Sequence, residues 1–180
     1  MSKKILAFGA SSSIHSINKQ LATFAAQQVK NATVTLLDLN NFEMPIYSVD
    51  KEQQLGIPKE AQLFKQHVRE TDGIIISFAE HNGAYSAAFK NIYDWMSRIG
   101  MPAWENKPML LLSTSRGGRG GLGVLTLAYD SFSFGNKKVS GKFALPAFQN
   151  NFSATEGILD ESLKAEFEKE LAKFEGILNA

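Results

Sequence analysis

Apolar and polar residues recur along the chain in two periods, which predict alternating strands and helices. Five short, nearly continuous apolar runs are typical of buried strands, and they occupy residues 3–9, 33–39, 73–78, 107–114 and 137–148. Between them, apolar residues recur at the spacing of an amphipathic helix, in residues 17–29, 58–71, 86–99, 124–134 and 160–178. Residues 40–56, interrupted by Pro45 and Gly56, are predicted to form a loop.

This alternation predicts an α/β fold in which helices cover both faces of a five-stranded parallel sheet. We find no repeat or linker, so residues 1–180 are predicted to form one domain. Two strand orders are common in such open sheets, 3-2-1-4-5 and 2-1-3-4-5, and both bind ligands beyond the carboxyl ends of the strands. The loops that follow the first, third and fourth strands therefore form the candidate site.

The loop after the first strand is rich in hydroxyl groups. Its sequence "GASSSIHSIN" (residues 9–18) leads into the first helix, whose unpaired N–H groups favour an anion such as phosphate. The candidate phosphate ligands are Ser11, Ser13, Ser16, Ile17 and Asn18. The alternative is an ordinary polar turn in which Ser16 caps the helix. Lys19 lies early in the helix, where a cation is unfavourable unless an anion is nearby.

Polar residues also follow the third predicted strand. Directly after the apolar run "GIIISF" come Ala79, Glu80, His81, Asn82 and Gly83. A polar cluster at the carboxyl end of a buried strand is typical of ligand sites in this architecture, and Gly83 allows the backbone to approach a ligand closely. Backbone groups in this loop suit the edge of a flat heterocycle, and an ordinary strand-to-helix turn is the alternative.

A glycine-rich loop, "STSRGGRGGLG" (residues 113–123), follows the fourth predicted strand. Its glycines permit a tight backbone wrap around a ligand, and the candidate ligands are Ser115, Arg116, Gly117 and Gly118. Arg116 and Arg119 are able to neutralise charge on a cofactor or second substrate. The alternatives are a flexible surface loop and a short RGG segment that binds nucleic acid.

Composition narrows the range of partners. The chain has 180 residues, 44% of them hydrophobic and 21% charged, with a net charge of +1 and no cysteine. The small net charge disfavours nucleic acid and acidic membranes as partners, and the absence of cysteine excludes disulfides and favours a cytoplasmic location. The apolar run "ILAF" is too short for a signal peptide, and no run approaches a membrane span.

Taken together, the three loops resemble the motifs of the NADPH-dependent FMN reductase family, over about residues 3–148. The first loop resembles the family's G-S-x-R-x-x-S-x-N, with Ser11, Ser16 and Asn18 in register. Ala10 stands in place of the motif's glycine, and Ser13 in place of its arginine.

The second and third loops also resemble motifs of this family. The second resembles P-E-Y-N-x-S-x-P-x-x-L-K-N-x-x-D-W, and the matching residues are Glu80, Asn82, Lys90, Asn91, Asp94 and Trp95. Ala79 replaces the proline and His81 the tyrosine, so a pH-sensitive side chain is expected near the flavin. The third resembles S-x-G-x-x-G-G through Ser115, Gly117, Gly120 and Gly121.

The resemblance implies a flavodoxin-like three-layer α/β/α sandwich with strand order 2-1-3-4-5. It implies that FMN binds with its phosphate on the first loop and its ring between the second and third. NADPH or NADH would be the electron donor, and a quinone, azo compound, free flavin or metal oxyanion the acceptor. Because the flavin carries the chemistry, we expect neither a catalytic side chain nor a metal.

The family also implies a homodimer or homotetramer, and Trp95, Met101 and Trp104 are candidates for the shared surface, with simple core packing as the alternative. Two other functions are open. One is a flavodoxin-like electron carrier that does not itself oxidise NAD(P)H, and the other is a binding module that uses its RGG loop for nucleic acid. The near-neutral charge disfavours both.

Overall fold

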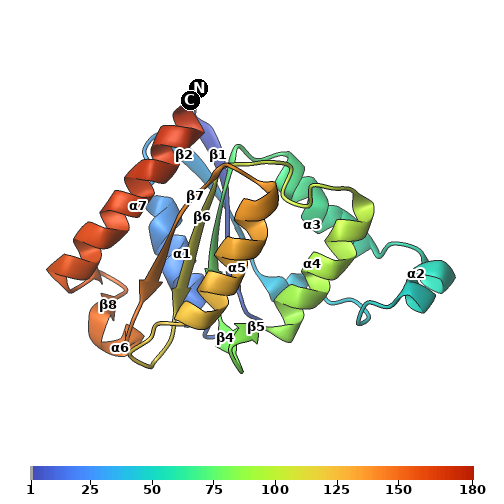
Figure 1. Ribbon diagram of the computed structural model, residues 1–180, viewed down its shortest axis with the longest axis horizontal. Helices are drawn as coiled ribbons and strands as arrows, with labels where there is room; N and C mark the ends of the chain where they lie inside the picture. The colour runs from blue at the N-terminus through green and yellow to red at the C-terminus, as the bar shows by residue number, and fades with distance from the viewer. Residues whose placement is uncertain (1) are drawn as a thin grey trace.

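Five parallel strands form the central sheet of the computed structural model, which describes residues 2–180 (Figure 1). The strands are β1 (Lys3–Ala10), β2 (Ala32–Leu37), β3 (Gly73–Phe78), β6 (Met109–Thr114) and β7 (Val139–Leu145). Their order across the sheet is β2-β1-β3-β6-β7. The predicted order 2-1-3-4-5 of the five main strands is therefore confirmed, with β1 paired to both β2 and β3.

Helices cover both faces of this sheet and form two separate apolar cores (Figure 1). One face is covered by α1 (Ile17–Gln27) and α7 (Glu161–Asn179), and the other by α3 (Lys59–Arg69), α4 (Ala87–Ile99) and α5 (Leu122–Gly135). Along β1, Leu6 joins one core and Ala7 the other. Because both faces of β1, β3 and β6 are buried, these inner strands read as continuous apolar runs, whereas the edge strands β2 and β7 are only partly buried. Within residues 2–180, no helix is long and apolar enough to cross a membrane.

Residues 40–56 differ from the sequence prediction. The second strand ends at Leu37, and a 3-10 turn (η1, Leu39–Asn41) follows it. The predicted loop contains α2 (Val49–Leu55), which begins after the N-cap Ser48 and has every residue outside the core. A helix without a buried face carries no apolar stripe, so the hydrophobic pattern could not reveal it.

Three further small elements were not predicted. They are the hairpin β4 (Glu80–His81) with β5 (Ala84–Tyr85), the hairpin β8 (Phe152–Ser153) with β9 (Gly157–Ile158), and the short helix α6 (Phe148–Asn151). Two-residue strands are too short to show the alternation by which strands are recognised.

The candidate association surface is contradicted by burial. Trp95 is 0% exposed and Trp104 4% exposed, and both pack in the core. The Trp95 indole N–H also donates to the carbonyl of Pro45 at 2.7 Å. Met101 is exposed, but it lies between α4 and β6, at the edge of the sheet where the strands begin. Burial therefore removes the two tryptophans from the predicted shared surface, whereas Met101 stays a candidate, and a homodimer or homotetramer stays a prediction.

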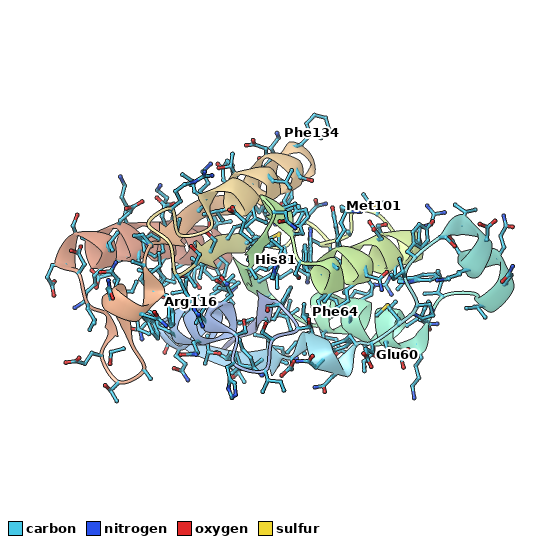
Figure 2. The ribbon with its side chains drawn as sticks, turned by 90° about the horizontal axis from the view of Figure 1, so that it is seen from below. Glu60, Phe64, His81, Met101, Arg116 and Phe134 are labelled. Atoms are coloured by element: carbon cyan, nitrogen blue, oxygen red, sulfur yellow. The ribbon has the colours of Figure 1, made fainter. Side chains whose placement is uncertain are left out.

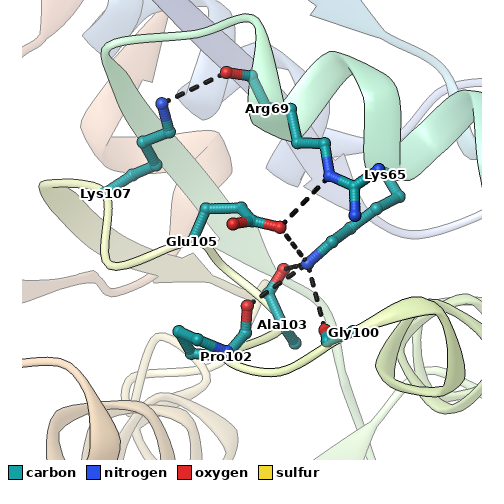
Figure 3. Close-up of polar contacts among 7 residues, drawn as sticks. All are labelled: Lys65, Arg69, Gly100, Pro102, Ala103, Glu105 and Lys107. Carbon is teal, nitrogen blue, oxygen red and sulfur yellow. Dashed lines mark hydrogen bonds and ion pairs between the residues drawn. The ribbon is translucent and has the colours of Figure 1, made fainter.

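A buried cation holds the loop that contains Met101 (Figure 3). Lys65 of α3 is 0% exposed, and its ammonium group donates to the carbonyls of Gly100, Pro102 and Ala103 at 3.2, 3.2 and 2.7 Å. It also pairs with the Glu105 carboxylate at 2.7 Å. This ion pair lowers the pKa of the Glu105 carboxyl, chiefly through the hydrogen bond from Lys65. Buried charges are tolerated when they are paired and hydrogen-bonded in this way.

We expect Lys65→Met to lower the free energy of unfolding at pH 7 by about 3 kcal/mol, because three carbonyls and a carboxylate lose their donor. Urea unfolding of the variant and the wild type measures this difference.

The same ion pair predicts how stability depends on pH. Since the pKa of Glu105 is lower in the folded state, the contribution of Glu105 to the free energy of unfolding is complete above the ordinary pKa of 4.5 and is lost as pH falls below it. Urea unfolding at several pH values should show the stability gap between wild type and Glu105→Gln closing between about pH 5 and pH 3. The exposed Glu168→Gln serves as control, and a gap that does not change with pH would contradict the assignment.

Candidate functional site

The three loops named by the sequence lie at one edge of the sheet. Residues 11–16 (the first loop) follow β1, residues 79–86 (the second loop) follow β3, and residues 115–121 (the third loop) follow β6. In the sheet, Ala10 lies opposite Phe78, and Phe78 lies opposite Ser113, so the three strands end level. Figure 2 views this edge, with His81 of the second loop and Arg116 of the third loop labelled.

A single buried amide, just after the first loop, is bonded to the strands that precede the second and third loops. Asn18, in the first turn of α1, is 3% exposed. Its side-chain oxygen accepts hydrogen bonds from the Ser77 hydroxyl at 2.7 Å and from the Thr114 backbone N–H at 3.0 Å. Its side-chain nitrogen donates to the Thr114 carbonyl at 3.1 Å. The Asn18 side chain therefore points into the protein, and its backbone N–H is the group left for the predicted phosphate.

Gly9 allows α1 to approach β1 closely enough for this contact. A Cβ atom at Gly9 would lie 2.4 Å from the backbone nitrogen of Lys19, a separation that no real side chain tolerates. The glycine at the end of β1 is thus required for close packing between strand and helix. It fixes the height of the helix N-terminus above the end of the strand.

Hydrogen-bond donors remain available on the first loop. Ser16 caps α1, as its hydroxyl oxygen accepts from the Lys19 N–H at 3.1 Å. The Ser11 hydroxyl oxygen accepts from the Ser13 N–H at 3.2 Å. Both hydroxyls keep their own hydrogen for donation. Within residues 2–180, the backbone N–H groups of Ile17 and Asn18 have no acceptor, as is usual at a helix N-terminus.

Lys19 lies in the first turn of α1, where a cation is unfavourable unless an anion is nearby, and the protein itself supplies that anion. Its ammonium group pairs with the Asp38 carboxylate, which follows β2. The hydrogen bond from Lys19 is the main reason that the pKa of Asp38 lies below its usual value. The sequence analysis did not single out Asp38 as this partner, because the two residues are brought together only by the β1–β2 pairing. Lys19 therefore contributes little net positive charge to the first loop.

The second loop is a tight hairpin. Asn82 and Gly83 have φ angles of 53° and 78°, so both are left-handed, as a two-residue type I′ turn requires. The positive φ of Gly83 favours glycine whether or not a ligand approaches, and a close approach of a ligand to this backbone stays a prediction. The hairpin ends at Ser86, which caps α4 and donates its hydroxyl hydrogen to the Ala10 carbonyl at 2.8 Å. His81 is exposed at this hairpin, as Figure 2 shows, while Ala79 is half-buried.

Glu80 ties the second loop to the helix that follows the third. Its carboxylate accepts from the backbone N–H of Val124 at 2.8 Å, in the first turn of α5. The N-cap of α5 is Gly121, which has no side chain with which to cap the helix. A carboxylate at a helix N-terminus also interacts favourably with the helix dipole. Glu80 thus supplies from a distance the cap that the local sequence lacks.

The third loop is held by backbone hydrogen bonds, and its arginines stay free. The Gly117 carbonyl accepts from Ala147 N–H at 2.9 Å, and the Ser113 hydroxyl donates to the Gly120 carbonyl at 2.7 Å. Arg116 and Arg119 are exposed, and neither makes an ion pair with any residue from 2 to 180. Exposed residues Gly117 and Gly118 lie between them.

The helical part of the second motif has a structural role. Asn91 accepts from the Tyr47 N–H at 2.8 Å and donates to the carbonyls of Met44 and Pro45, the same segment that Trp95 contacts. Lys90 and Asp94 form an exposed pair one turn apart. Asn91 and Trp95 thus fasten the segment before α2 to α4.

The structure thus brings the predicted residues of all three loops to one edge of the sheet. The side chains of Asn18 and Glu80 form hydrogen bonds within the protein there.

The sequence analysis did not identify three residues that hold this edge, namely Ser77, Thr114 and Asp38. The first two follow apolar runs as small polar residues at strand ends, which is the one signal that could have identified them. Asp38 carries a similar signal, since it directly follows the second strand.

Comparison with known proteins agrees with this arrangement. The profile of the family described as NADPH-dependent FMN reductase matches residues 3–150. An NADPH:quinone oxidoreductase from Arabidopsis thaliana is 30% identical over 144 residues, which are 77% of this chain and 70% of that protein. A quinone reductase from Escherichia coli K12 is 32% identical over 79 residues, which are 44% of this chain and only 42% of the relative's length.

Solved structures show the same fold. The flavoenzyme NAD(P)H:(acceptor) oxidoreductase FerB from Paracoccus denitrificans superposes with a TM-score of 0.74 at 19% identity, covering 98% of this chain and 97% of that one. A flavodoxin mutant from Pseudomonas aeruginosa gives a TM-score of 0.54 at 16% identity, with 98% and 99% covered. The match over residues 3–150 and the strand order lead to one conclusion: the chain is a flavodoxin-like member of the NADPH-dependent FMN reductase family.

Proposed function

We propose that this protein binds FMN at the three-loop edge and passes electrons from NADPH or NADH to a small-molecule acceptor. The observation that carries the proposal is the Asn18 cross-link, which holds a helix N-terminus with free N–H groups beside two loops from neighbouring strands. A ligand with an anionic end and a flat heterocycle matches that arrangement. Relatives named as quinone and azo reductases support the same class of acceptor.

The residues of the first loop fit a phosphate. The N–H groups of Ile17 and Asn18 and the hydroxyls of Ser11 and Ser16 all have hydrogens to donate. An anion at a helix N-terminus is favoured by these groups together with the helix dipole. The loop would therefore hold a phosphate with neutral donors, with Ser13 exposed beside them.

The second and third loops would hold the flavin ring. His81, Asn82 and Gly83 of the hairpin present backbone groups, and Ser115 to Gly118 line the other side. When bound, FMN supplies the hydride and electron transfer, so these residues need only bind and orient it. Arg116 and Arg119 supply free positive charge at this edge and would favour anionic donors or acceptors.

The proposal predicts a yellow protein that a nicotinamide nucleotide bleaches. Purified protein mixed with FMN should retain it through gel filtration, and anaerobic NADPH or NADH should remove the flavin absorbance near neutral pH. A protein that binds FMN but keeps its colour with both donors would instead be an electron carrier. Failure to retain FMN would overturn the proposal altogether.

Asn18→Ala should weaken both the fold and the site. Removing the amide leaves the buried Ser77 hydroxyl and Thr114 backbone groups without partners, which costs about 3 kcal/mol. The FMN dissociation constant should rise about tenfold or more, because the first and third loops lose their shared anchor. Urea unfolding and fluorescence titration of FMN measure the two effects. The surface variant Asn179→Ala should change neither, and wild-type FMN affinity in Asn18→Ala would refute the positioning role.

Ser13→Arg should tighten FMN binding by restoring the cation that the family motif has at this position. Ser13 is exposed on the first loop, so a longer side chain has room to extend toward the bound phosphate. Because a charge-assisted hydrogen bond is stronger than a neutral one, we expect a gain of about fivefold at low salt and less at high salt. Ser12→Arg is the matched control. No gain would mean that hydroxyls and helix N–H groups already suffice.

A further inference from the structure

A cavity of about 370 Å³ lies beside the first loop on the outer side of α1. Residues 14–16 form one end of it, the solvent side of α1 forms its floor, and Phe152 and Ala154 of the β8–β9 hairpin form the far wall. Of the residues of the proposed flavin site, Ser16 alone also lines this cavity, and the rest of its lining is unassigned. Its volume is in the range of small-molecule sites.

The outer face of α1 has an unusual composition for an exposed helix surface. Lys19 is the single charged residue in α1, whereas α7 on the same face of the sheet is densely charged. The cavity floor carries Gln20, Thr23 and Gln27, which share one side of the helix because they are spaced at three and four residues. Amide and hydroxyl groups there favour a neutral ligand that both donates and accepts hydrogen bonds.

Two aromatic rings give the cavity an apolar wall. Phe24 and Phe152 are half-buried and pack edge to face, with ring centroids 5.5 Å apart. Half-exposed rings of this kind are surfaces on which nucleic acid bases stack. A glutamine amide can also form two hydrogen bonds with the edge of an adenine. The combination of rings and glutamines therefore fits a purine better than it fits an aliphatic ligand.

The rim of the cavity carries groups for a sugar phosphate. Lys19 lines it, paired with Asp38 directly after β2, and exposed His15 lies at the first-loop end. Lys19 is thus the cation of the cavity lining, and its partner Asp38 accepts from Lys19 and Asn40.

We propose that this cavity binds the adenosine end of the nicotinamide donor, with Gln20, Phe24 and Gln27 contacting the purine. The inference rests on the proposed function, because it assumes that NADPH or NADH is the donor. Ser16 belongs to both the first loop and the cavity, so the two sites are contiguous. A donor with its nicotinamide at the flavin would reach the cavity by crossing the first loop.

The first experiment compares donors with and without adenosine. Reduced nicotinamide mononucleotide lacks adenosine, so wild type should use it about tenfold less efficiently in kcat/KM than NADH or NADPH. Thr23→Trp, which fills the cavity, should remove that advantage and leave the mononucleotide rate unchanged. The matched control is Thr35→Trp, which fills a different hollow lined by Thr35 and His67, and it should behave as wild type.

The second experiment needs no turnover. Adding 5′-AMP or 2′,5′-ADP to the flavin-free protein should shift the amide NMR signals of Gln20, Thr23 and Gln27, and Thr23→Trp should abolish the shifts. Tighter binding of 2′,5′-ADP would assign Lys19 to the 2′-phosphate of NADPH, and Lys19→Ala should then remove the difference. Equal binding of the two nucleotides would assign the cavity to the adenosine shared by both donors.

The two proposals fail in different ways. If no donor reduces the flavin but both nucleotides bind at α1, the proposed function is wrong and the adenosine site stands as a nucleotide site. If the flavin is reduced while Thr23→Trp has no effect on the donor preference and no nucleotide shifts the α1 signals, the adenosine site is refuted alone.

Discussion

The arrangement of the site depends on one buried amide, that of Asn18. Its three hydrogen bonds connect the first turn of α1 to Ser77 in β3 and to Thr114 at the end of β6. Three loops that are far apart in the sequence thereby share one buried anchor. A buried amide with all these partners satisfied is specific in geometry, because any shift of one strand end would leave a polar group unpaired. The helix N-terminus is held at that anchor by the close approach at Gly9.

The other contacts that hold the loops at this edge leave little unpaired charge on the first and second loops. Glu80 caps α5, Lys19 is paired with Asp38, and Ser86 bonds to the end of β1. Fixed partners of this kind leave helix N–H groups and hydroxyls as the available donors of the first loop. Free positive charge remains on Arg116 and Arg119 in the third loop. The neutral donors and the cations are thus on different loops, which suits a ligand with separate recognition at its two ends.

The two edges of the sheet differ in how their loops are held: one has a buried ion pair, and the other keeps exposed polar groups. At the edge where the strands begin, Lys65 and Glu105 lock the loop before β6 with a buried ion pair and three carbonyl contacts. At the edge where they end, the loops keep exposed groups such as His81 and Arg116 (Figure 2). Helix α4 connects the two edges, and its Asn91 and Trp95 hold the segment before α2. Family motif residues on that helix therefore maintain the fold around the site.

The sequence by itself determined the five strands, the main helices and the edge at which the loops meet, because burial on both faces leaves continuous apolar runs and parallel strands share one carboxyl edge. The Ser16 cap, which the sequence analysis offered only as an alternative to a phosphate site, is also present, since capping is a local interaction. Only the tertiary structure decided that Asn18 points inward, that Glu80 caps α5, that Lys19 meets Asp38 and that Trp95 and Trp104 are buried. Each of these depends on a partner distant in sequence. The sequence analysis did not predict helix α2, because a helix with no buried face has no apolar pattern by which to recognise it.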